Sequence, residues 1–94
     1  MFKKNLIEDI SKNINKAENI TDLQELCKFK YIEQDFFTIL KDNNSFKKEL
    51  SKDKYMKFLK MVFEARKRRF TRVIKNQENY EKIKRDIDIY FKNR

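Results

Sequence analysis

The chain has 94 residues, of which 39% are hydrophobic and 41% are charged, and its formal net charge is +9. This length fits one small domain. The absence of histidine and the presence of one cysteine exclude a His-based acid–base pair, a Cys–His nucleophile, the usual zinc sites and an intrachain disulfide. We therefore expect no enzymatic activity, no metal and no other cofactor.

The chain also lacks glycine and proline and is rich in lysine, glutamate, leucine and isoleucine, which predicts an all-α fold. Acidic residues stand near the N-terminus, where a signal peptide needs an apolar run. No apolar stretch approaches the length of a membrane span. We expect a cytoplasmic protein without a membrane partner, in which Cys27 is a small core residue.

Two helices are expected in the first 30 residues. The first covers 3–16, because its apolar residues recur at helical spacing on one face. The second begins at Thr21, whose hydroxyl and Gln24 three residues later form a capping box. The helical period is then interrupted at 28–31.

A third helix is expected over 32–41, with Phe36, Phe37, Ile39 and Leu40 as its apolar set. Asparagines end it, and Ser45 caps a further turn. Ser51 then caps a long basic helix that starts at Lys52.

The stretch 52–75 holds ten basic and two acidic residues, so it carries about +8 of the net charge. On a helix one of its faces is apolar, formed by Tyr55, Leu59, Val62, Phe63, Phe70 and Val73. Seven basic residues share the other face: Lys54, Lys57, Lys60, Lys67, Arg68, Arg72 and Lys75. Arg66 and Arg69 fall on or beside the apolar face, which calls for a carboxylate, an opening to solvent or a partner.

A single helix from 52 to 92 would be about 60 Å long, too long for a compact domain of about 13 Å radius of gyration. We predict a break near 76–79, with Asn79 as a new cap. The alternative is an unbroken helix that pairs with another chain in a homodimer, because Val73, Tyr80 and Ile87 are seven residues apart.

Residues 22–50, followed by the long charged helix, resemble a helix-turn-helix unit, with Leu26, Cys27, Ile32, Phe37 and Leu40 at the inward positions. Over 22–70 the chain resembles small phage helix-turn-helix proteins, namely the DNA-binding segment of terminase small subunits. Tyr31 stands at the turn position that is usually glycine. The resemblance implies DNA binding by the helix at 33–41, with Gln34 and Thr38 as candidates for base reading. An ordinary helical hairpin without DNA contact stays open.

Together these patterns predict a bundle of four to five helices in one domain, with a compact half over 1–50 and a long basic helix over 51–94. Residues 1–44 have a net charge of about −1 and residues 45–94 of about +10, which suggests anion contact by the second half. We expect non-specific contact with nucleic-acid phosphates, DNA rather than RNA. The residues expected to make it are Lys57, Lys60, Arg66, Lys67, Arg68, Arg69, Arg72 and Lys75.

Two alternatives remain at this point. The protein could be a phage or mobile-element module that binds an acidic protein surface and blocks a host machine. Some aromatic residues, which otherwise belong to the core, could also stack on single-stranded bases: Phe29, Tyr31, Phe36 and Phe37.

Overall fold

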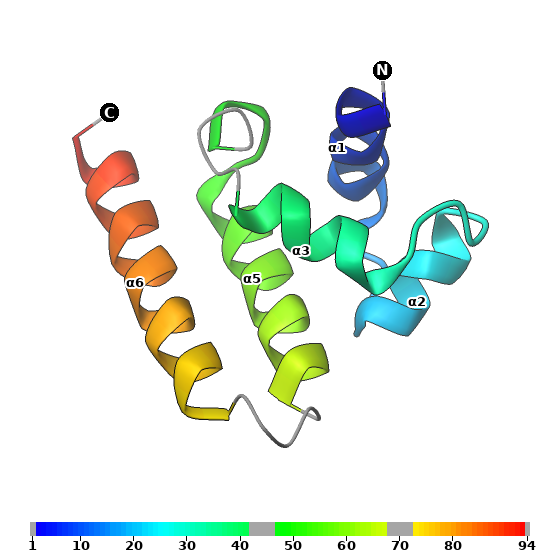
Figure 1. Ribbon diagram of the computed structural model, residues 1–94. Coiled ribbons are helices and arrows are strands. Elements are labelled where there is room, and N and C mark those ends of the chain that lie inside the picture. The colour runs from blue at the N-terminus through cyan, green and yellow to red at the C-terminus, as the bar shows by residue number, and fades with distance from the viewer. Residues whose placement is uncertain (1, 42–46, 68–72, 94) are drawn as a thin grey trace.

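The structure is a computed structural model. It describes the backbone of residues 2–41, 47–67 and 73–93, and the side chains of 5–41, 47–65 and 77–93. Its helices, shown in Figure 1, are α1 (Phe2–Asn13), α2 (Ile20–Leu26), α3 (Glu33–Lys41), α5 (Lys52–Lys67) and α6 (Val73–Lys92). Residues 47–49 form a helical turn, and the described residues contain no strand. The expectation of a small all-α bundle is confirmed.

Helix α5 lies at the centre of the bundle. In Figure 1, α6 runs beside it in the opposite direction, α3 crosses it, and α1 and α2 lie on its other side. The radius of gyration is 12.7 Å. The predicted apolar face of α5 is buried at Tyr55, Leu59 and Val62, and burial extends further to Phe58 and Met61. The apolar face of α5 is therefore wider than its sequence indicated, because helices pack against it from several directions.

The stretch 52–92 forms two helices, as predicted, but the predicted position of the break near 76–79 is wrong. Helix α5 ends at Lys67, and α6 begins at Val73 and continues through Asn79. The reason is tertiary, since the fold-back buries Ile87 of α6 completely in the core that α5 shares. The rings of Phe63 and Tyr80, 4.5 Å apart between centroids, add a second contact between the two helices. Tyr80 and Ile87, two of the residues that suggested a coiled coil, thus pack within their own chain.

The caps of the first two helices also differ from the prediction. Helix α1 ends at Asn13 rather than near 16, and Ile14 after it is still buried. Helix α2 begins at Ile20, and its N-cap is Asn19, whose side chain accepts a hydrogen bond from the Asp22 amide at 2.9 Å. The predicted Thr21 capping box is therefore wrong. Asparagine is a better N-cap than threonine, and an earlier start places the buried Ile20 within the helix.

Ser51 caps α5 as predicted, because its hydroxyl accepts a hydrogen bond from the Lys54 amide at 3.3 Å. At the start of α3 the Asp35 carboxylate accepts from the Ile32 amide at 2.8 Å, the reach-back half of a capping box. Ser45 lies outside the described residues.

The turn between α2 and α3 is a Schellman motif made without glycine. The amide of Phe29 donates to the Gln24 carbonyl at 2.7 Å, and that of Lys28 donates to the Glu25 carbonyl at 2.9 Å. Lys28 and Phe29 have φ angles of 59° and 57°, in the left-handed region that favours glycine. The glycine-like positions are thus 28 and 29, and not Tyr31 as the resemblance placed them.

Tyr31 instead anchors the turn to the bundle. Its buried ring meets Phe36 edge to face at 6.2 Å, and its hydroxyl donates to the Asp9 carboxylate of α1 at 2.8 Å. Burial, followed by the hydrogen bond to Asp9, raises the pKa of Tyr31 from its ordinary value of 10.0 to about 12.

The φ angle of Lys28 makes Lys28→Gly a stabilising substitution. We expect the free energy of unfolding to rise by about 0.5–1 kcal/mol, because glycine adopts positive φ without the steric cost of a Cβ. A urea titration followed by circular dichroism measures it. Lys30→Gly is the matched control, since it also removes an exposed lysine but at ordinary φ. That control should be neutral or destabilising, and a stabilisation of equal size there would contradict the argument.

Tyr31→Phe should lower the free energy of unfolding at neutral pH by about 1.5–3 kcal/mol, because it removes a hydrogen bond to a charged group. In the wild type, the pKa of Tyr31 is higher in the folded state than in the unfolded state. The stabilisation by its hydroxyl is therefore complete below pH 10.0 and is lost as the pH rises towards about 12. The variant should therefore show a flatter stability profile over that range in urea titrations. Tyr80→Phe is the control and should keep the wild-type slope.

Candidate functional site

The lysines at the start of α5 are engaged within the protein. Lys54 donates its Nζ to the Ser11 carbonyl at 2.9 Å, and Lys57 donates to the Asn15 carbonyl at 3.1 Å. Both carbonyls lie at or just past the C-terminal end of α1, where helix carbonyls lack partners and where positive charge suits the helix dipole. These two half-buried lysines therefore hold α1 against α5.

Lys60, one turn further along α5, is exposed. It lines a cleft of about 280 Å³ between α2, α3 and α5. Three glutamates line the same cleft: Glu18, Glu33 and Glu64. Of the two acidic residues within 52–75, only Glu64 lines this cleft, and the fold brings Glu18 and Glu33 to it from other parts of the chain. Over 52–65, the cationic face is therefore not continuous.

Three of the other predicted contact residues belong to the ends of α5 and α6 that follow one another in the chain. Arg66 and Lys67 end α5, and Lys75 lies in the first turn of α6, with the side chains of all three outside the described part. Arg68, Arg69 and Arg72 lie outside the described residues. The stretch 66–76 contains six basic residues and no acidic residue. It joins the C-terminal end of α5 to the N-terminal end of α6.

The described exposed surface of α6 has a different character. Three basic side chains, Lys82, Arg85 and Lys92, are exposed there among three acidic ones, Glu78, Glu81 and Asp88. Asp88 also pairs with Lys52 of α5 at 3.2 Å, with both side chains about half exposed. A surface with balanced, interspersed charges is typical of a solvated face.

Gln34 and Thr38, the candidates for base reading, are both exposed on α3. The Thr38 hydroxyl donates to the Gln34 carbonyl at 2.9 Å, so its proton is already engaged. Of the five predicted inward positions, Cys27 and Leu40 are buried and Phe37 is half-buried, but Leu26 and Ile32 are exposed, contrary to the prediction.

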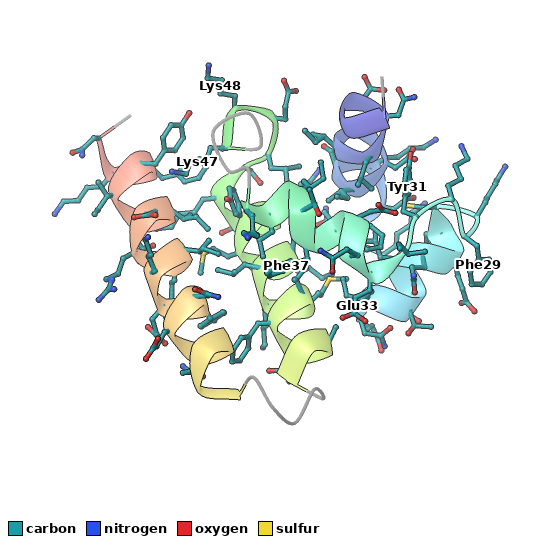
Figure 2. All side chains as sticks on the ribbon, viewed as in Figure 1. Phe29, Tyr31, Glu33, Phe37, Lys47 and Lys48 are labelled. Atoms are coloured by element: carbon teal, nitrogen blue, oxygen red, sulfur yellow. The ribbon has the colours of Figure 1, made fainter. Side chains whose placement is uncertain are left out.

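The aromatic candidates separate clearly by burial. Tyr31 and Phe36 are buried, whereas Phe29 is 69% exposed. Figure 2 shows Phe29 at the edge of the molecule, pointing away from the bundle, while Phe37 lies over the middle of it. The exposure of Phe29 follows from the turn geometry, for which its Lys-Phe-Lys context is the only local signal in the sequence.

Among the described residues, no three histidine, cysteine, aspartate or glutamate side chains come together in a way that could hold a metal ion. Across the same part of the chain, no helix has the length and apolar character needed to cross a membrane. Burial, ahead of the Asp9 charge, raises the pKa of the Cys27 thiol, which makes it a poor nucleophile.

Comparisons of the chain with protein-family models, with curated proteins and with solved structures find no match.

Mutation can distinguish a lysine of α5 that is hydrogen-bonded to α1, such as Lys54, from one that is exposed, such as Lys60. Lys54→Met keeps the aliphatic stem but removes the donor to Ser11, and should lower the free energy of unfolding by about 1–2 kcal/mol. Lys60→Met, its matched control on the exposed surface, should change stability by less than about 0.5 kcal/mol. Urea titrations of both variants measure this. Equal destabilisation by the two would contradict a structural role for Lys54.

Proposed function

We propose that this protein binds nucleic acid, DNA in particular, mainly through the phosphates. In this proposal the contacts are made at the end of the hairpin where α5 finishes and α6 starts. One observation carries the proposal: residues 66–76 hold six basic residues without an acidic one, against a net charge of +9 for the whole chain. Charged residues that merely keep a protein soluble normally include both signs in mixture, as they do on the described exposed surface of α6.

Within α5 and α6, the described surface supports this location by exclusion. The lysines at 54 and 57 are engaged with backbone carbonyls, and Lys60 shares its cleft with three glutamates. The exposed charges of α6 balance one another. Within these two helices and their connection, positive charge is therefore most concentrated over residues 66–76. A polyanion would be attracted most strongly there.

The helix ends at this point are consistent with that role. Basic residues at the C-terminal end of α5 complement the negative end of its dipole, so their concentration there does not oppose the helix. Helix α6 has no acidic residue in its first turn, so no carboxylate of that turn competes with an incoming phosphate for the amides of the helix N-terminus.

The composition of residues 66–76 suits contact with phosphates better than it suits base reading. Four of the six basic residues are arginines, which can fork two donors onto one phosphate. Gln34 and Thr38 lie on α3, a helix that begins with Glu33 and also carries Asp35 in its first turn. Contacts to phosphates position a protein without reading sequence, so weak sequence preference and a steep dependence on salt are expected.

The triple substitution Arg68→Ala, Arg69→Ala and Arg72→Ala tests the location. For each phosphate that the variant no longer neutralises, the slope of log K against log salt should fall by about 0.9 on duplex DNA. Fluorescence anisotropy with a labelled duplex, over a series from low to moderate salt, measures affinity and slope together. Circular dichroism checks that the variant retains its helices.

The matched control replaces the same number of charges on α6, in Lys82→Ala, Arg85→Ala and Lys92→Ala. It should leave the salt slope close to that of the wild type, because those side chains lie among acidic ones. If the slope falls equally in both triple variants, net charge alone governs binding and the location is wrong. If the wild type binds neither DNA nor RNA at low salt, where such affinity is strongest, the proposed function itself is wrong.

A further inference from the structure

The turn between α2 and α3 presents an aromatic ring to solvent. Phe29 is 69% exposed, and Figure 2 shows it at the outer edge of the molecule. Leu26 and Ile32 beside it in the chain are 37% and 63% exposed. Large apolar side chains exposed together mark a place where a partner is bound more often than scattered single ones do.

The backbone holds this ring outward on a rigid support. The Phe29 amide is fixed to the Gln24 carbonyl at 2.7 Å, and the Gln24 side-chain amide donates to the Tyr31 carbonyl at 3.1 Å. Buried Tyr31, two residues further on, is tied to Asp9 of α1. In a Schellman motif the residue in the position of Phe29 commonly packs back on the helix, and here it does not.

The conformation itself is costly. Both Lys28 and Phe29 adopt positive φ, which residues with a Cβ avoid. Strained backbone of this kind persists where the surrounding structure enforces it, and it concentrates at sites of function.

The charges around the ring favour an anionic partner. Lys28 and Lys30 flank Phe29 directly, and both are exposed. Glu25 is the one exposed acid in residues 25–32. An aromatic face between two exposed cations matches the way single-stranded nucleic acids are bound, with a base stacked on the ring and phosphates near the cations.

We propose that this turn is a stacking platform for an unpaired base of single-stranded nucleic acid, with Lys28 and Lys30 contacting the neighbouring phosphates. The inference rests on the proposed nucleic-acid binding and deepens it. Bases within a duplex are already stacked on one another, so the Phe29 ring adds affinity only for single strands. Phosphate contacts elsewhere on the protein serve both forms.

The test compares Phe29→Ala with the wild type on two probes: a labelled oligothymidylate, which forms no duplex, and a labelled duplex hairpin. Removal of the stacking ring should weaken binding to oligothymidylate by roughly 5- to 150-fold and leave duplex affinity unchanged. Ile89→Ala is the control, because Ile89 is also a large exposed apolar residue, 58% exposed, but lies on α6 away from the turn. It should leave both affinities unchanged.

Two further variants separate stacking from simple apolar contact. Phe29→Trp keeps an aromatic face and should retain or strengthen oligothymidylate binding. Phe29→Leu keeps an apolar side chain without a π-face and should weaken it as Phe29→Ala does. Thermal melts establish that each variant is folded.

The outcomes distinguish this inference from the function on which it rests. If Phe29→Ala leaves oligothymidylate affinity unchanged while the wild type binds duplex with a steep salt slope, the platform is wrong and phosphate binding stands. Wild-type affinity in Phe29→Leu would also overturn the platform, because it points to an apolar pocket on a protein. Absence of any binding to either probe at low salt overturns both proposals.

Discussion

The burial of α5 is the constraint on which the rest of this structure depends. Tyr55, Phe58 and Leu59 are nearly or fully buried, so one helix supplies the surface against which the others pack. Burial on this scale stabilises a chain in which only 39% of residues are hydrophobic, because large aromatic rings contribute much of the apolar area. Aromatic contacts join the turn, α3 and α5. The ring of Phe36 meets those of Tyr31 and Phe58 edge to face, at 6.2 and 6.0 Å between centroids.

Enclosing a helix that is rich in lysine has an electrostatic consequence. Half-buried charges are stabilised by hydrogen-bond acceptors, and Lys54 and Lys57 donate to carbonyls at or just past the end of α1. The stretch that looked from the sequence like a continuous cationic track is thus divided. Its first half stabilises the bundle, and its second half, at the end of the hairpin, is left for the anionic partner that we propose.

The α2–α3 turn likewise contains, within a few residues, one aromatic side chain that stabilises the bundle and one that is exposed. Tyr31 points inward to Asp9, and Phe29 points outward, although both are aromatic and both follow a lysine. Left-handed conformations at two successive residues separate their directions. A chain without glycine bears the cost of that geometry, which is one reason to connect the turn with function rather than with folding alone.

Local patterns in the sequence determined the all-α class, the apolar residues of α1, the Ser51 cap and the concentration of basic residues after 65. Each depends on neighbours along the chain, so helical spacing and composition suffice to predict it. Only the tertiary structure decided where α5 ends, that Asn19 caps α2, that Leu26 and Ile32 are exposed, and that Lys54 and Lys57 are engaged. Those outcomes depend on which helices meet, because the gain from burying Ile87 or Phe58 outweighs the small differences in local propensity that the sequence displays.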